Sequence, residues 1–112
     1  MPATAIRLFR FEDIKPRKGA GRLAAFPLVT AAMSQTFGMN YTVFNECAVD
    51  HVLTYDEALY CVSGEIDIVV GSERYQLKSQ DAIWLPNGTR LQYLTRTTAT
   101  VLAIYYPSAP PS

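Results

Sequence analysis

The sequence lacks any excess of charge and any long apolar run. Its ten basic and ten acidic residues cancel, and no segment is obviously basic, so the electrostatic signature of a nucleic-acid-binding protein is missing. No apolar run approaches the roughly 20 residues that a membrane helix needs. We therefore expect neither nucleic acid nor a membrane as a partner, and we expect a small organic molecule instead.

The chain has only two cysteines, Cys47 and Cys61, and it starts without the basic and apolar regions of an export signal. Disulfide frameworks belong to oxidising compartments. We therefore interpret both cysteines as reduced thiols and expect a cytoplasmic protein. Cys61 stands between Tyr60 and Val62, and such apolar neighbours raise a thiol pKa, which favours inert packing over a nucleophilic role.

What the sequence does contain is aromatic residues in alternating runs. A length of 112 residues is enough for one domain with one core. Seven Tyr, five Phe and one Trp lie mostly in alternating segments, which favours sheet over helix. No sustained 3.6-residue period predicts a long helix. Many short segments separated by Gly, Pro and Ser turns predict an all-β sandwich or barrel.

The expected strands cover residues 40–46, 50–54, 57–62, 65–70, 73–78, 82–85, 90–95 and 98–106. Before them, Arg22 to Met33 predicts one or two strands interrupted at Pro27, which belongs on a sheet edge or at a bend. Gly38 then predicts a break in the chain.

The two ends of the chain differ from its middle. Residues 1–20 predict an N-terminal arm, and its alternating run Ile6–Phe11 is expected to pair with the sheet edge of a second subunit. We expect residues 21–106 to form the domain. The three prolines in residues 107–112 predict a flexible tail. We therefore expect a homodimer that forms through sheet edges and the arm.

The chemically richest stretch is HVLTYDEALYCVSG, which holds the only histidine. His51 and Leu53 share one face of an extended segment, and Glu57 opens the next strand with Leu59 and Cys61 on its own side. A carboxylate among leucines loses solvent, which raises its pKa toward neutrality, and histidine is its natural proton-transfer partner. The pair predicts general acid-base chemistry. The alternative is a structural role, with Glu57 a buried acceptor.

Other side chains are expected to reach the same cavity. Tyr55, between the two strands, joins His51 and Glu57 as a candidate catalytic residue, because a phenol can donate to a developing oxyanion. Packing is the alternative for any tyrosine. Arg90 could bind a carboxylate or phosphate, or be a solvated loop-end charge. Tyr60 should face the other way and cover the sheet or a subunit interface. The expected ligand-binding residues are Tyr41, Leu53, Leu59, Cys61, Trp84, Arg90, Leu91 and Tyr93.

Two motifs resemble those of the cupin superfamily. Glu57 followed by six residues and Gly64 matches the second half of the first cupin motif, and His51 stands where that motif has its first histidine. The second cupin motif is similar to the run DAIWLPNG at residues 81–88. The resemblance covers roughly residues 38–106. It implies a single-domain cupin, a small jelly-roll-like β-barrel of two packed antiparallel sheets.

Within that superfamily, the triplet at residues 55–57, the upstream Glu46 and the turn at Gly64 and Glu65 look most like the EutQ-type small cupins. That group is named for ethanolamine-utilisation accessory proteins, and members resembling it often lack the full metal set. Acetate kinase activity has been attributed to the namesake, whose chain carries a long N-terminal region that this sequence lacks. The resemblance therefore implies kinase chemistry only remotely.

The departures from the cupin pattern concern its metal ligands. The pattern has two histidines in H-x-H, the glutamate and a third histidine after P-x-G, whereas this sequence has Leu53 and Leu91 at two of these positions. Only His51 and Glu57 remain, and two ligands hold a first-row metal poorly. Cys61 or Glu46 could complete a replacement set of ligands. We therefore expect no cofactor, and a divalent metal is disfavoured.

Two functions fit these residues. The first is a metal-independent enzyme of lyase, isomerase or cyclase type, in which Glu57 and His51 move a proton and tyrosines hold the substrate oxygen. The second is a binding or accessory module of the EutQ-like type that uses the same pocket without chemistry. Contact of Glu57 and His51 with each other or with one ligand would favour the enzyme. Contact of both with backbone groups would favour the module.

Overall fold

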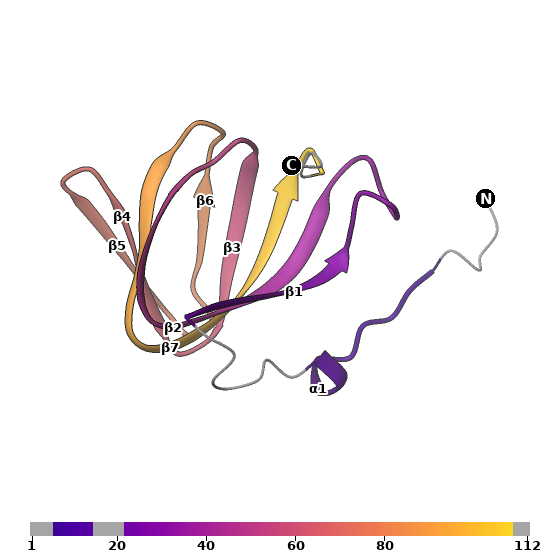
Figure 1. Cartoon of the computed structure of the whole chain (residues 1–112), viewed down its shortest axis with the longest axis horizontal. Helices are drawn as coiled ribbons and strands as arrows, with labels where there is room; N and C mark the ends of the chain where they lie inside the picture. The colour runs from indigo at the N-terminus through magenta and orange to yellow at the C-terminus, as the bar shows by residue number, and fades with distance from the viewer. Residues whose placement is uncertain (1–5, 15–21, 109–112) are drawn as a thin grey trace.

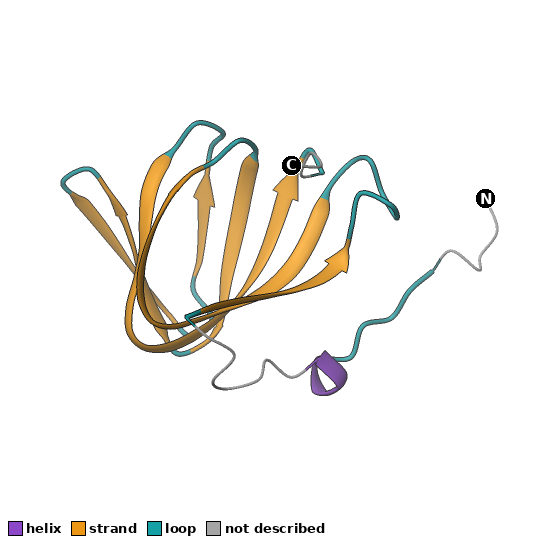
Figure 2. Ribbon diagram, viewed as in Figure 1, coloured by secondary structure: helices purple, strands orange, loops and turns teal. Residues whose placement is uncertain are grey.

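The computed structural model describes residues 6–14 and 22–108, and almost all of its regular structure is strand (Figures 1 and 2). The expected all-β fold is confirmed. The elements are, in chain order, α1 (Phe11–Ile14), β1 (Leu23–Val29), β2 (Gly38–Val52), β3 (Asp56–Ser63), β4 (Glu65–Val70), β5 (Glu73–Lys78), β6 (Ala82–Leu85) and β7 (Arg90–Tyr106).

Strand β7 is the centre of the sheet. It pairs antiparallel with β2, β3 and β4, which gives the strand order β1-β2-β7-β3-β6 with the β4–β5 hairpin attached to β7. The long strands β2 and β7 lie side by side over their whole length and curve strongly in Figure 1. The two expected sheets are therefore two layers of one hydrogen-bonded sheet that folds over along these strands.

Strands β3 to β6 match the expected segments closely, but the segments 40–46 and 50–54 form the single strand β2. A β-bulge between Asn45 and Cys47 shifts the register there, and Glu46 adopts a left-handed φ of 43°. A bulge bends a strand and leaves the ladder on both sides intact. The expected break between two strands is therefore wrong.

The segments 90–95 and 98–106 likewise form the single strand β7. Its irregular middle keeps its hydrogen bonds, because Thr95 Oγ1 donates to the Glu65 carbonyl oxygen at 2.9 Å and accepts from the Thr97 backbone N–H at 3.2 Å. The expected break between residues 95 and 98 is therefore wrong as well.

Pro27 and Gly38 were expected to interrupt the chain, and the structure bears this out only in part. Pro27 lies in β1, which pairs with β2 and is an edge strand of the described sheet, and the register shifts between Pro27 and Val29. This is the edge position expected for a proline in a sheet. Gly38, in contrast, opens β2 and does not break the chain. A side chain at Gly38 would overlap the ring of Tyr105, so the close packing of β2 and β7 requires glycine there.

The N-terminal segment does not form the expected strand within this chain. Residues 6–10 lie outside the strands, and Phe11 begins the short helix α1. The Phe11 ring packs edge-on against Tyr41 of β2, with ring centroids 5.2 Å apart. Pairing of this segment with a second subunit stays a prediction. The rest of the arm, and the tail beyond Ser108, lie outside the described residues.

The core lies between the two layers. On β3 the inward residues Glu57, Leu59 and Cys61 are buried, whereas Ala58 and Tyr60 between them are exposed, as the alternation predicted. The largest side chains that are fully buried are Leu53, Ile66, Ile68, Val101 and Cys61.

The helical part of residues 6–14 and 22–108 includes no segment with the length and apolarity that a membrane crossing requires.

Candidate functional site

Glu57 faces a cavity of about 200 Å³ between the two layers, with only 4% of its surface exposed. Loss of solvent penalises the charged carboxylate and raises the pKa of Glu57 from 4.5 to about 7, against the opposing effect of a hydrogen bond from Tyr93. The direction is the one that the sequence predicted. Near neutral pH, Glu57 therefore exists in both protonation states.

Tyr93 holds this carboxyl group in place. Its hydroxyl donates to Glu57 Oε1 at 2.9 Å, and its ring packs on Phe44 with centroids 4.9 Å apart. Burial, and then the negative charge of Glu57, raise the pKa of Tyr93. Tyr93 therefore stays a neutral hydrogen-bond donor, and the ring contacts fix the direction in which it donates.

His51 and Tyr55 lie on the solvent side of the same cavity. His51 is exposed, and its Nε2 lies 3.4 Å from the Tyr55 hydroxyl oxygen. The His51 ring stacks on Tyr93 at a centroid distance of 6.2 Å. Burial, followed by the charge of Glu57, raises the pKa of Tyr55 to about 12. An imidazole open to water and two neutral phenols thus surround one buried carboxyl group.

The rest of the cavity wall is mostly apolar. It comes from β1, β2, β3 and β7, and none of the described residues that form it is Lys or Arg. Its polar part on β2 is Asn40 and Thr42, where Thr42 Oγ1 donates to Asn40 Oδ1 at 3.0 Å. The wall residues are Leu23, Ala25, Asn40, Thr42, Phe44, Val49, His51, Tyr55, Glu57, Leu59, Tyr93, Val101 and Ala103.

Sequence reasoning missed the part of this wall that precedes the bulge in β2. Alternation counted back from His51 places Tyr41 inward, but the bulge near Glu46 reverses the alternation. Asn40 and Thr42 therefore face the cavity, and Tyr41 packs outward against Phe11. The expectation that Tyr41 lines the cavity is wrong. The inward-facing apolar position at Phe44 is the one signal that could have revealed the reversal.

Three of the expected ligand-binding residues belong to the core and not to the cavity wall. Leu53, Cys61 and Leu91 are buried, and none of them lines the cavity. The Cys61 thiol lies 3.6 Å from the Ser63 carbonyl oxygen and 3.5 Å from that of Gly64. Burial raises the pKa of Cys61, as predicted, which disfavours the reactive thiolate.

Two further expected ligand-binding residues lie away from the cavity. Trp84 is on the outer face of β6 with 61% of its surface exposed, so the expectation that it lines the cavity is wrong. Arg90 begins β7 and borders a separate depression of about 400 Å³ together with Asp50 and His51. Of the eight expected ligand-binding residues, the cavity wall includes Leu59 and Tyr93. It also includes all three candidate catalytic residues, His51, Tyr55 and Glu57.

The described residues of the site do not provide a complete set of metal ligands. Within residues 6–14 and 22–108, no group of three His, Cys, Asp or Glu side chains is placed to hold an ion. Leu53 and Leu91, at the positions where cupins carry histidines, provide no donor atoms. His51 and Glu57 make their hydrogen bonds with tyrosines instead.

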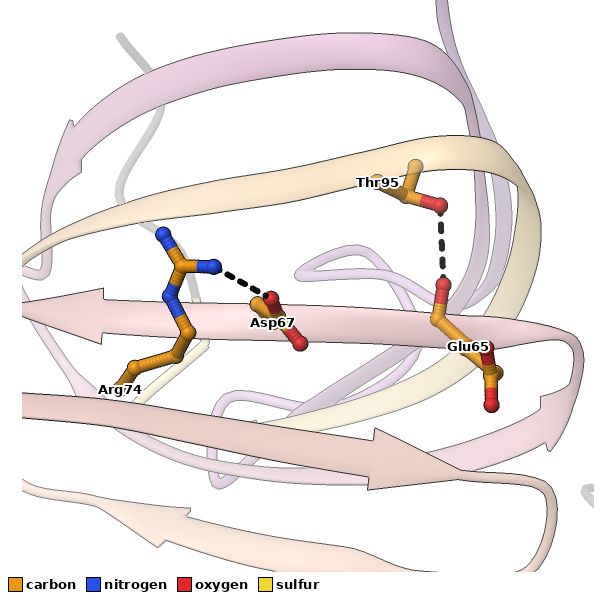
Figure 3. A network of polar contacts seen from close by, with 4 residues as sticks. All are labelled: Glu65, Asp67, Arg74 and Thr95. Atoms are coloured by element: carbon orange, nitrogen blue, oxygen red, sulfur yellow. Dashed lines mark hydrogen bonds and ion pairs between the residues drawn. The ribbon is translucent and has the colours of Figure 1, made fainter.

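A separate depression of about 290 Å³ lies over β4, β5 and β7, and it contains none of the expected site residues. Arg74 Nη1 and Asp67 Oδ2 lie 3.3 Å apart there, close to the contact between Thr95 and Glu65 (Figure 3). Exposed ion pairs of this kind stabilise a fold only slightly. Asp67 and Arg74 both belong to the β4–β5 hairpin, so the ion pair links its two strands, whereas the hydrogen bond from Thr95 to Glu65 links the hairpin to β7.

Comparison with known proteins shows to which family the chain belongs. The model of a family described as ethanolamine utilisation protein EutQ matches residues 9–111. The chain belongs to the EutQ family. The fold is that of a cupin, a name that other similar solved structures carry. The resemblance seen in the motifs around Glu57 and Pro86 is thereby confirmed.

Individual relatives of this EutQ-family chain are distant. The acetate kinase EutQ of Clostridioides difficile strain 630 is 27% identical over 81 residues, which are 72% of this chain and 52% of the relative. The chain thus spans about half the length of that protein. The structure of the Clostridium difficile EutQ protein is similar with a TM-score of 0.86 at 21% identity, over 96% of this chain and 84% of that one.

A solved enzyme structure is also similar. The polyketide cyclase RemF from Streptomyces resistomycificus has a TM-score of 0.77 at 16% identity, over 95% of this chain and 82% of that one. At this identity the likeness concerns the fold alone.

Proposed function

We propose that the cavity binds a small organic molecule and that Glu57 transfers a proton to or from it, in a metal-independent reaction of lyase, isomerase or cyclase type. The observation that carries this proposal is the carboxyl group of Glu57, which faces the cavity with a pKa of about 7. A group with such a pKa exchanges protons efficiently near neutral pH.

The neighbouring residues have complementary roles in this reaction. Glu57 takes a proton from the substrate, and the Tyr55 hydroxyl donates to the substrate oxygen on which negative charge develops. Tyr93 orients Glu57 through the bond of 2.9 Å. His51, which is exposed beside Tyr55, exchanges protons with water at the entrance.

The cavity wall also restricts the substrate. Because none of the described wall residues is Lys or Arg, a buried carboxylate or phosphate would find only the His51 imidazole there to compensate for its charge. A volume of about 200 Å³ is smaller than the cavities that hold drug-sized ligands. A small neutral or cationic molecule therefore fits best. Solved structures of this fold include a polyketide cyclase, which is consistent with chemistry of the cyclase type.

The experiment has two stages. A panel of small carbonyl compounds, amines and carboxylates is screened by thermal shift, since a ligand that binds the folded state raises the melting temperature. Compounds that bind are then incubated with the protein in D2O, and proton exchange or product formation is followed by NMR. Stabilisation by neutral or cationic compounds, but not by carboxylates, is the expected result.

The decisive variant is Glu57→Gln, which keeps the shape but removes the titrating proton. Turnover of an identified substrate should fall by about 10² or more while ligand affinity stays close to wild type. Glu73→Gln, on the exposed strand β5, is the matched control and should leave turnover unchanged. Wild-type turnover in a folded Glu57→Gln protein would rule out the catalytic role.

A binding or accessory module without chemistry is the second candidate, and the bond from Tyr93 favours it, since it already satisfies one oxygen of Glu57 as a buried acceptor would. The side chains of Glu57 and His51 make no hydrogen bond with the backbone of the described residues, although backbone contact of both is the arrangement that we expect of the module. Acetate kinase activity is the weakest candidate, because the described cavity wall offers no lysine or arginine for a phosphate.

A further inference from the structure

Asn40 and Thr42 are polar side chains of the cavity wall to which the proposed reaction gives no role. Thr42 Oγ1 donates to Asn40 Oδ1 at 3.0 Å, which engages the amide oxygen and fixes the orientation of the amide group. Within residues 6–14 and 22–108, the Asn40 amide nitrogen makes no hydrogen bond. No buried polar side-chain atom in these residues lacks a partner, so this nitrogen is accessible, and its N–H groups can donate to a ligand.

The pairing of the strands shows on which side of Asn40 this nitrogen lies. Gly38 of β2 and Glu57 of β3 pair with the same residue of β7, and residues paired in this way share one face of the sheet. Asn40 lies two residues beyond Gly38, and Thr42 lies two residues further in the same direction. Because the amide oxygen is directed toward Thr42, the amide nitrogen lies on the opposite side of the group, which is the side nearer to Glu57.

The space between Asn40 and Glu57 is open because the residue beside them is small. Ala103 of β7 pairs with Asn40 on one side and with Leu59 of β3 on the other, and all three line the cavity. Two strand spacings and two residue rises place the Cα atoms of Asn40 and Glu57 about 12 Å apart. Both side chains extend into the cavity and shorten this distance. A chain of a few bonded atoms therefore spans the two polar groups.

We propose that the Asn40 amide N–H groups bind a second oxygen atom of the substrate, so that the substrate is a neutral compound with two carbonyl groups. One carbonyl lies at Glu57 and Tyr55, and the other lies at Asn40. This assignment rests on the proposed function, since Glu57 and Tyr55 act on the first carbonyl. An amide N–H requires an acceptor, and a neutral carbonyl oxygen provides one without bringing a charge into the cavity. A protonated amine is only a donor, so Asn40 disfavours it.

The test uses three ligands with one carbon skeleton. N,N-dimethyl-4-oxopentanamide is the neutral keto amide, with two carbonyl groups. In 6-methylheptan-2-one the second carbonyl and the nitrogen are replaced by hydrocarbon, and in 5-(dimethylamino)pentan-2-one a protonated amine remains without the second carbonyl. Because all three keep the first ketone, differences between them report on the environment of Asn40. Their affinities are measured by NMR titration.

Asn40→Leu keeps the approximate size of the side chain but removes the amide. It should lower the ratio of keto amide affinity to 6-methylheptan-2-one affinity by about 5- to 10-fold, as the loss of one hydrogen bond predicts. Asn45→Leu is the matched control and should leave the ratio unchanged. Asn45 lies on the same strand and also accepts from a threonine hydroxyl, that of Thr98 at 2.9 Å, but it does not line the cavity.

Two further variants test the direction of the amide. Asn40→Asp replaces the donor by an acceptor, and Thr42→Val removes the hydroxyl that holds the amide oxygen, so that the amide can turn its oxygen toward the ligand. Both should raise the affinity for the amino ketone relative to the keto amide, by about 5-fold or more in Asn40→Asp. A merely structural role of Asn40 would weaken all three ligands alike. That result, an unchanged ratio in Asn40→Leu, or no binding of the keto amide would overturn the proposal.

Proton exchange of the keto amide in D2O separates this proposal from the proposed function. Exchange that is lost in Glu57→Gln, with a ratio that Asn40→Leu does not change, would refute the assignment of Asn40 and leave the catalytic role of Glu57 intact. No exchange in the wild type, with a ratio that depends on Asn40, would refute the catalytic role and leave the assignment of Asn40 as a binding residue intact.

Discussion

Glu57 is the residue at which the fold and the proposed chemistry oppose each other. A buried carboxylate destabilises the folded state. Here the hydrogen bond from Tyr93 offsets part of this effect, and no lysine or arginine of the described cavity wall adds to it. A raised pKa is the result. The same burial that favours proton transfer near neutral pH should therefore be visible as a pH-dependent loss of stability.

The first prediction concerns this pH dependence. The folded state keeps the Glu57 proton up to a pKa of about 7, whereas the unfolded chain loses it near 4.5. The folded state thus binds more protons between these values, and its stability should fall as pH rises through them, by about 3 kcal/mol in all. Urea unfolding of Glu57→Gln should show a flatter profile between pH 4.5 and 8 than the wild type. Parallel profiles would contradict the raised pKa.

The second prediction separates Tyr93 from Tyr55. The Tyr93 hydroxyl stabilises the charged form of Glu57, so Tyr93→Phe should raise the pKa of Glu57 above about 7 while keeping the ring contact with Phe44. Tyr55→Phe removes a hydroxyl that lies near His51 and should leave the pKa of Glu57 close to the wild-type value. A ¹³C NMR titration of the Glu57 carboxyl carbon measures both. Equal shifts in the two variants would refute the role given to Tyr93.

At the scale of elements, the bulge in β2 decides which residues reach the cavity. Glu46 occupies a left-handed backbone conformation with a φ of 43°, which costs an L-residue other than glycine about 1 to 2 kcal/mol. This conformation bends β2 without interrupting it, because β2 pairs with β7 on both sides of the bulge. It also turns Asn40 and Thr42 toward the cavity.

The third prediction tests the strain at the bulge. Glu46→Gly should stabilise the fold or leave it unchanged, and Glu46→Val should destabilise it by about 1 to 2 kcal/mol, because β-branched residues resist positive φ. Ala48→Gly, at an exposed position on the same strand, is the control and should destabilise by about 0.5 to 1 kcal/mol. Unfolding in urea compares the three. A destabilising Glu46→Gly would show that the bulge is not strained.

The bounds of β3, β4 and β5 are predicted well, and on β3 and β4 the buried positions also follow directly from period 2. The sequence pattern divides each of the long strands β2 and β7 in two, because the register shift at their shared bulge interrupts the alternation. On β6, Ala82, Ile83, Trp84 and Leu85 are all apolar, so no pattern indicates which side faces inward. Trp84 was placed wrongly for this reason.

The candidate site follows the same logic. Positions fixed by the cupin-like motif and by local alternation, Glu57 and His51, face the cavity as expected, and so does Tyr93 two residues beyond Leu91. The wall from β1 and from the first half of β2 depends on the bulge and on pairing between distant segments, which a single sequence does not encode locally.

For the molecule as a whole, the fourth prediction concerns metal content. The described residues provide no set of three ligands, so purified protein should contain zinc, iron, nickel or manganese at well below one ion per chain. Chelation should also leave the melting temperature unchanged, because no binding energy is linked to folding. Elemental analysis and a melting curve with and without chelator measure this. One ion per chain would refute the prediction.

The central position of β7 also has a consequence for how the chain folds. Gly38 pairs with Tyr105 and Val52 pairs with Arg90. The β2–β7 ladder therefore cannot form until β7, which is synthesised much later than β2, is available. The β4–β5 hairpin and the β1–β2 ladder join near neighbours and can form early, whereas closing the long loops between β2 and β7 is entropically slow. Folding should therefore take milliseconds to seconds. While β7 is still inside the ribosome, the edge of β2 that pairs with β7 is exposed. We expect the nascent chain to be most prone to aggregation at this stage.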